Sequence, residues 1–258
     1  MGGHTFLNTE PIRIGLIKPT LEQLLMDLKT RLNITDYTVI GSTYKKPISN
    51  DIDILIRGDQ IGRNADVKIY NTLKQIYPNF QVSHNKGLKV SNIAYPIYGE
   101  NGFVQIDLMV TYGKYALEYG KFIYHSPFQH TSKYSGAQRT NLLYTLCRYI
   151  DTHVSEREYF EDGSLKTFKK YSLLPKGLYL QERSFEGKKG RIKTAWLKKQ
   201  KFITNNPTRI LNILFGKMVS LQDFDSVETI FSMLERLPLF NETKKEIYEY
   251  FNHYIIKL

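Results

Sequence analysis

The sequence predicts an α+β fold, in which a mixed β-sheet packs against helices and a mostly helical C-terminal region follows. Short apolar runs bounded by turn residues occur in the first half of the chain, at 37–40, 52–56 and 103–110. Segments with apolar residues at helical spacing separate or follow them. The 258 residues are 41% hydrophobic and 13% aromatic, enough to bury a core in one large or two small domains.

The expected elements of the first half alternate between helix and strand. A leucine stripe predicts a helix over residues 19–32, starting at Pro19. A strand at 37–40 and a strand opening at Asp51 follow. A second helix is expected at 64–76, and its inward residues should be the apolar ones, namely Val67, Ile69, Tyr70, Leu73 and Ile76. Residues 87–110 then predict a β-hairpin.

The second half is expected to be mainly helical. Helices are predicted at 137–152, 207–216, 225–236 and 242–256; Asn206 and Pro207 form a typical helix start. An acidic stretch at 151–163 predicts a domain boundary. We therefore expect a first domain at 1–152 and a basic, mostly helical region at 153–258.

Two aspartates open the strand that begins at residue 51. Side chains alternate along a strand, so Asp51 and Asp53 share one face and the isoleucines between and after them share the other. Two carboxylates about 6 to 7 Å apart repel each other unless a cation lies between them. Hard oxygen ligands of this kind suit Mg²⁺ or Mn²⁺. The alternative is that this Asp-x-Asp pair binds nothing.

A glycine and a serine end the preceding strand. Gly41 has no Cβ and lets the backbone approach a phosphate, and Ser42 adds a hydroxyl and an N–H donor. A polar loop separates this pair from Asp51. The alternative is an ordinary Gly-Ser turn.

A third acid, Asp107, lies inside the apolar strand FVQIDLMV. An aspartate in such a strand is costly unless it is paired or ligates a metal. The alternative is an exposed residue on an edge strand, but the run around it is typical of a central strand.

Together these residues resemble the DNA polymerase β-like nucleotidyltransferase superfamily. Its signature is a Gly-Ser at a strand-to-helix turn, a spacer, an Asp-x-Asp on the next strand and a third acid on a later strand. Here these are Gly41-Ser42, Asp51 with Asp53, and Asp107. The resemblance covers about residues 20–110.

The resemblance implies a nucleotidyltransferase-type sheet and a two-metal transfer of a nucleoside monophosphate from a nucleoside triphosphate. Asp51 and Asp53 would bridge both ions, and Asp107 would complete the second site and assist deprotonation of the acceptor. Gly41 and Ser42 would meet the phosphates. Lys45 or Lys46 would neutralise the leaving pyrophosphate, although many relatives have an Arg or small residues in this spacer.

The chain is basic, with a formal net charge of +11. Residues 166–217 contain many lysines and arginines, only two acids, and aromatic residues between the cations. This pattern favours a nucleic acid acceptor, contacted by Arg139, Trp196, Lys198, Lys199 and Lys201. A solvated basic face fits the same composition.

Cys147 is the single cysteine, so an intramolecular disulfide and a cysteine-based zinc site are excluded. Its position among leucines at helical spacing indicates a small core residue and not a nucleophile. The chain has no apolar run long enough to span a bilayer and no secretory pattern at its start. We therefore expect a cytoplasmic protein without a membrane partner.

Two classes of function fit these observations. One is an active nucleotidyltransferase, whose acceptor is a nucleic acid end, a protein or a small molecule. The other is a catalytically idle protein that binds nucleotides or nucleic acid on the same scaffold. The presence of all three acids favours the active enzyme.

Overall fold

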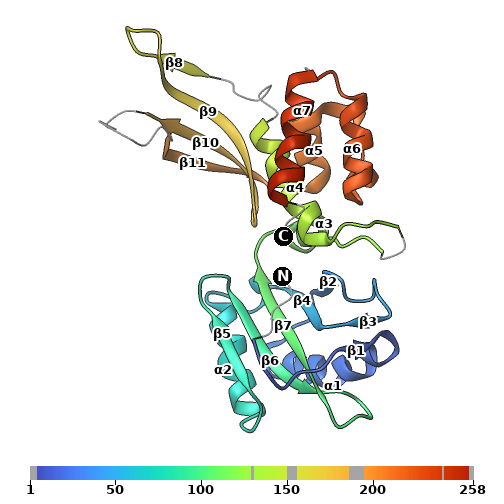
Figure 1. Ribbon diagram of the computed structural model, residues 1–258. Helices are drawn as coiled ribbons and strands as arrows, with labels where there is room; N and C mark the ends of the chain where they lie inside the picture. The colour runs from blue at the N-terminus through green and yellow to red at the C-terminus, as the bar shows by residue number, and fades with distance from the viewer. Residues whose placement is uncertain (1–4, 129–130, 150–155, 186–194, 240, 256–258) are drawn as a thin grey trace. The chain divides into compact units, whose positions relative to one another are not determined.

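The computed structural model describes residues 5–128, 131–149, 156–185, 195–239 and 241–255 (Figure 1). The chain divides into two compact units, Met1–Ala137 and Gln138–Leu258. This division comes earlier than the boundary expected between residues 152 and 153. Both of those residues lie outside the described residues.

The first unit is built on a five-stranded mixed sheet with strand order β2-β4-β7-β6-β5. Strands β4 and β7 are parallel, and the other neighbouring pairs are antiparallel. The strands of this sheet are β2 (Tyr37–Ile40), β4 (Asp51–Arg57), β5 (Val82–Asn85), β6 (Val90–Pro96) and β7 (Phe103–Thr111). Two short strands, β1 (Ile12–Arg13) and β3 (Ile48–Ser49), pair separately.

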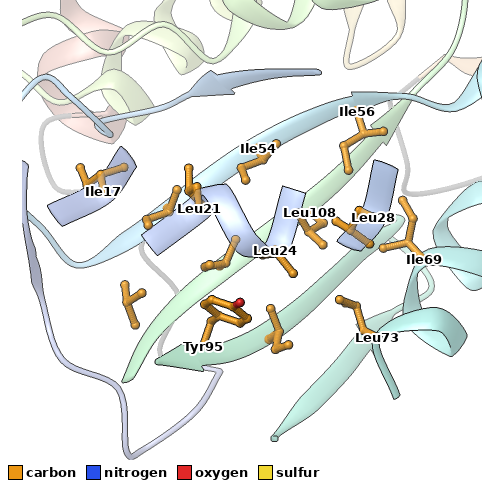
Figure 2. Close-up of a cluster of buried hydrophobic side chains, with 14 of the residues drawn as sticks. Ile17, Leu21, Leu24, Leu28, Ile54, Ile56, Ile69, Leu73, Tyr95 and Leu108 are labelled. Carbon is orange, nitrogen blue, oxygen red and sulfur yellow. The ribbon is translucent and has the colours of Figure 1, made fainter. Parts of the chain in front are cut away.

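One face of this sheet carries the main hydrophobic core. Helices α1 (Ile14–Leu32) and α2 (Ala65–Ile76) pack there. Figure 2 shows the leucines of α1 lying against the isoleucines of β4 and against Leu108. The face predicted for Ile54 and Ile56 is therefore the core face, and the aspartates of β4 point to the other side of the sheet.

The opposite face packs against α3 (Ala116–Ile123), an element that the sequence did not predict. A small cluster that includes Ile40, Leu55 and Met109 lies there, with Leu117 of α3 against it. Gly120 allows the close approach, because a Cβ at this position would lie 1.9 Å from Leu55 Cδ2.

Two expectations about the helices of this unit were wrong. Helix α1 begins at Ile14, before Pro19, because Ile17 is fully buried and Ile14 N–H donates to Pro47 O at 2.9 Å. Packing thus outweighs the hydrogen bond that Pro19 cannot make. In α2, Val67 was expected to face inward but is 38% exposed. Asp66 points inward instead, where its Oδ2 lies 3.0 Å from His84 Nε2.

The second unit begins with a helix and an antiparallel sheet. Helix α4 (Gly136–Tyr149) starts just before the division. The sheet has the order β11-β10-β9-β8, formed by β8 (Arg157–Tyr159), β9 (Leu165–Leu174), β10 (Gly177–Ser184) and β11 (Trp196–Thr204). The helices expected near the C-terminus are present, but this sheet, which contains most of the basic stretch, was not expected.

The remaining helices follow the sheet. They are α5 (Pro207–Phe215), α6 (Val227–Arg236) and α7 (Asn241–Tyr250), with a π-helical turn at Phe251–Ile255. Asn206 caps α5 by accepting from Arg209 N–H at 2.9 Å, as the sequence predicted. None of the helices in the described parts of the chain combines the length and the apolar character needed to cross a bilayer.

Candidate active site

Three carboxylates meet on the sheet face opposite the main core. In the parallel pair of β4 and β7, Asp53 is the register partner of Asp107, and Asp51 is the partner of Gln105. Residues opposite one another in register share a face. One carboxylate oxygen from each of Asp51, Asp53 and Asp107 lies within 4.8 Å of the others. The edge-strand alternative for Asp107 is wrong, because β7 is the middle strand.

Burial makes this cluster electrostatically costly. Asp51 is 4% exposed and Asp53 is 9% exposed. The pKa of Asp53 is raised well above its usual value by burial first, and then by the charges of Asp51 and Asp107. A cation among the three carboxylates would offset this repulsion. The donors are hard oxygens that converge from one sheet face, so the residues present fit Mg²⁺ or Mn²⁺.

Two buried amides hold Asp107. Asn92 Nδ2 and Gln105 Nε2 both donate to Asp107 Oδ1, at 2.6 and 2.8 Å. Burial raises the pKa of Asp107, and these two hydrogen bonds act in the opposite direction. The amides therefore favour the ionised carboxylate, which is the form that ligates a metal.

Gly41 lies against the cluster. Its φ is +68°, and a Cβ there would lie 2.3 Å from Asp53 Oδ2. Its N–H donates to Tyr124 O at 3.2 Å. We expected the missing side chain to give room to a phosphate. In the structure that room is taken by the Asp53 carboxylate.

The rest of the loop differs from the expected pattern in one respect. The chain after Gly41-Ser42 turns into strand β3, and no helix follows. Thr43, which is 3% exposed, accepts from Asp53 N–H through its Oγ1 at 3.3 Å and so joins the loop to β4. Lys45 Nζ lies 4.0 Å from the centre of the Phe128 ring, and Lys46 is exposed.

Sequence reasoning missed four residues beside the carboxylates: Thr43, Asn92, Gln105 and Tyr124. Burial raises the pKa of the Tyr124 hydroxyl, and the charge of Asp53 raises it further. A signal for two of them was available. Gln105 lies two residues before Asp107, on the same strand face, and Asn92 interrupts an apolar alternation in the preceding strand.

The residues expected to contact an acceptor separate into two groups. Arg139 is 1% exposed, and its Nε donates to the carbonyl oxygen of Phe224, so contact with an acceptor does not fit its burial. The other four lie on β11, where they are exposed: Trp196, Lys198, Lys199 and Lys201.

Cys147 lies on α4. Burial raises the pKa of its thiol to about 12, so the thiolate is scarce at neutral pH. This agrees with the expectation that Cys147 is not a nucleophile, although its side chain is only partly buried.

No protein family model and no curated protein sequence matches the chain. A structure of Cid1, described as an RNA terminal uridylyl transferase, covers 54% of this chain and 40% of its own, with 14% identity and a TM-score of 0.34. A structure of a cytoplasmic RNA terminal U-transferase covers 57% of this chain and 43% of its own, with 15% identity and a TM-score of 0.33. A structure of the Cid1 poly(U) polymerase bound to MgGTP covers 57% of this chain and 45% of its own, with 13% identity and a TM-score of 0.34. The chain spans less than half the length of these structures.

The chain resembles the DNA polymerase β-like nucleotidyltransferases. What carries this resemblance in the chain itself is the glycine turn at Gly41, the Asp-x-Asp of β4, and Asp107 on the parallel strand beside it. All of these residues lie within the first unit.

Proposed function

We propose that this protein is a metal-dependent nucleotidyltransferase, which transfers a nucleoside monophosphate from a nucleoside triphosphate to an acceptor hydroxyl. The observation that carries the proposal is the convergence of Asp51, Asp53 and Asp107 on one sheet face, within 4.8 Å of one another. Such a buried group of acids destabilises the fold unless it binds a cation, so its presence needs a functional reason.

In this proposal Asp51, Asp53 and Asp107 hold Mg²⁺ or Mn²⁺. The bound ion would neutralise charge on the triphosphate and lower the pKa of the attacking hydroxyl. Ser42 offers its hydroxyl to the phosphates, and Lys45 and Lys46 place positive charge in the same loop. The residues of the chain act by positioning and by charge stabilisation.

The reaction forms a bond between the acceptor oxygen and the α-phosphorus. The bond from the α-phosphorus to the oxygen bridging to the β-phosphate breaks, and pyrophosphate leaves. The hydroxyl proton passes to solvent. Asp107 stays ionised, because the amides of Asn92 and Gln105 favour its charged form, and so it can ligate the ion that lowers the pKa of this hydroxyl.

A nucleic acid end is the acceptor that the charge distribution favours. Strand β11 is an edge strand with exposed lysines at 198, 199 and 201. Trp196 and Phe202 of the same strand are 46% and 48% exposed. Cations with exposed aromatic rings suit contacts to phosphates and stacking of unpaired bases.

The test is a transfer assay with the purified full chain. Each of the four labelled ribonucleoside triphosphates is incubated with Mg²⁺ or Mn²⁺ and with RNA, DNA and protein acceptors. We expect label on RNA or DNA ends, release of pyrophosphate, and no product with Asp51→Asn. Label on protein would show that the reaction is correct and that the acceptor is a protein. Nucleotide binding without any transfer would identify an idle protein and contradict the proposal.

A further inference from the structure

The two amides that contact Asp107 are both deeply buried. Asn92 is 6% exposed and Gln105 is 1% exposed. Both donate to the same oxygen, Oδ1 of Asp107. A buried amide is costly unless its donors and its acceptor are bonded. Two amides on one carboxylate oxygen are therefore a feature that needs an explanation beyond packing.

Each amide is itself fixed by a donor on its oxygen. Ser83 Oγ donates to Asn92 Oδ1 at 3.2 Å, and the backbone N–H of Thr5 donates to Gln105 Oε1 at 2.9 Å. Since the amide oxygens accept these bonds, the NH₂ groups must face Asp107. The orientation of Asp107 thus depends on two separate chains of hydrogen bonds.

The sheet register brings these chains to the carboxylates. Ser83 pairs with Asn92, Asn92 pairs with Asp107, and Asp107 pairs with Asp53. These four polar residues cross four neighbouring strands on the same face as the cluster. The second chain reaches the sheet from the N-terminal segment, through Thr5.

We propose that Asn92 and Gln105 are positioning residues, which clamp Oδ1 of Asp107 so that its other oxygen, Oδ2, is presented to the divalent cation. The inference rests on the proposed function, because it concerns the same site. Hydrogen-bond donors of this kind hold a metal-ligating side chain in one orientation. The side chain then loses less conformational freedom when the metal binds. Removing one typically weakens metal affinity by about 10- to 100-fold.

Direct Mn²⁺ binding to the full chain tests the clamp without reference to activity. Asn92→Leu and Gln105→Met remove the donors and keep the approximate side-chain volume. Each should weaken Mn²⁺ binding about 10-fold or more, as measured by electron paramagnetic resonance of the unbound ion. The same substitutions on exposed positions of α2, Asn71→Leu and Gln75→Met, should leave the affinity unchanged.

A milder pair of variants isolates one hydrogen bond. Thr5→Pro removes the N–H that fixes Gln105, whereas Thr5→Ala keeps it, and the Thr5 side chain is exposed. We expect Thr5→Pro to weaken Mn²⁺ binding about fivefold relative to Thr5→Ala. This comparison decides the role of Gln105 even if the core substitutions unfold the protein. Ser83→Ala serves the same purpose for Asn92.

The outcomes separate the clamp from the function. If the parent protein binds Mn²⁺ and the folded variants bind it equally well, the clamp is wrong and the proposed function stands. If the parent protein binds no Mn²⁺, the proposed function fails, and the clamp fails with it. A loss of thermal stability without a change in Mn²⁺ affinity would assign the amides a structural role only and would also overturn the inference.

Discussion

At the scale of single residues, Gly41 and Asp53 act as a pair. The position of a side chain at residue 41 is taken by Asp53 Oδ2, 2.3 Å from the ideal Cβ. The left-handed backbone of Gly41, with φ of +68°, also disfavours other residues. Substitution of Gly41 is therefore opposed both by the clash with Asp53 and by the left-handed backbone. A second glycine with a left-handed backbone but no such clash distinguishes the two effects.

We expect Gly41→Ala to abolish nucleotide transfer, because the new Cβ displaces the Asp53 carboxylate. Gly99 has a φ of +73° with nothing within 4 Å of its ideal Cβ. Gly99→Ala should thus show the backbone cost alone, about 1 to 2 kcal/mol of unfolding free energy, and keep full activity. Urea unfolding and the transfer assay measure the two effects. Equal activity of the two variants would contradict the pairing.

The raised pKa of Asp53 predicts how stability depends on pH. Since the folded pKa lies above the unfolded value, the folded metal-free protein binds more protons between the two. Its free energy of unfolding should therefore fall as pH rises from about 4 through the folded pKa. Bound Mn²⁺ would offset the repulsion among the carboxylates, which is greater at pH 8, where fewer protons are bound. It should therefore stabilise the protein more at pH 8 than at pH 5. Thermal unfolding with and without Mn²⁺ at both pH values measures this difference.

Asp53→Asn should remove transfer activity and at the same time stabilise the metal-free protein at pH 8. It deletes a ligand, and it also deletes the buried charge that repels Asp51 and Asp107. Each pKa unit of the wild-type shift corresponds to about 1.4 kcal/mol. Asp59→Asn, at an exposed position where the new side-chain oxygen can still accept from Gly113 N–H, is the matched control and should change neither property. Near-parental turnover of Asp53→Asn would exclude its role as a metal ligand.

A site residue could be recognised from the sequence only where its polarity differs from that of the residues around it. Asp107 conflicts with the apolar strand around it, so it could be found. Asn92 and Gln105 conflict less, because an uncharged amide costs less to bury than a carboxylate. Thr43 gives no signal, since its bond to Asp53 N–H depends on the path of the loop.

At the scale of secondary structure, the parallel pairing of β4 and β7 makes the site. The pairing places Asp53 beside Asp107, although 53 residues separate them in the chain. Alternation along each strand could be read from the sequence, and it fixed the correct faces. The register between β4 and β7 could not be read from the sequence, because it depends on how β6 and β7 pair and on the length of α2.

The sheet of the second unit shows the limit of periodicity. Residues 165–184 contain alternating lysines, aromatics and leucines, but both faces of β9 are partly exposed, so no clean apolar stripe results. Helices α5 and α6, in contrast, carry caps at Asn206 and Ser226 and fully apolar inner faces. Elements with caps and a single buried face were predicted, and the half-exposed strands were not.

The packing of α3 gives a prediction at this scale. Gly120→Ala should cost about 1 to 3 kcal/mol, because the added Cβ would lie 1.9 Å from Leu55 Cδ2 on the strand that carries Asp53. Leu55→Ala leaves a cavity but makes room for the new Cβ. In a double-mutant cycle the pair should therefore be less destabilising than the sum of the single changes. Additive unfolding free energies would show that α3 does not rest on Leu55.

At the scale of the whole molecule, the chain combines an acidic site in the first unit with a basic surface in the second. The net charge of +11 is thus not spread evenly. Three of the lysines lie on β11, the exposed edge strand of the second sheet. Lysines on an edge strand also prevent strands of other molecules from pairing there. Binding measurements must separate this protective role from contact with a nucleic acid.

Salt dependence provides that separation. Each phosphate neutralised on a single strand contributes about −0.7 to the slope of log affinity against log salt. Replacing Lys198, Lys199 and Lys201 with Ala should flatten the slope for single-stranded RNA or DNA by up to about two units, similarly for all sequences. Trp196→Ala should weaken binding with little change in slope, because stacking is not ionic.

The matched control removes the same charge elsewhere. Lys18, Lys29 and Lys86 are exposed lysines of the first unit, and their triple replacement with Ala lowers the net charge equally. If both triple variants flatten the slope to the same extent, binding reflects overall charge and β11 has no specific role. If the wild-type protein shows no salt-dependent binding to either nucleic acid, the basic strand only protects the sheet edge. The acceptor must then be sought among proteins and small molecules.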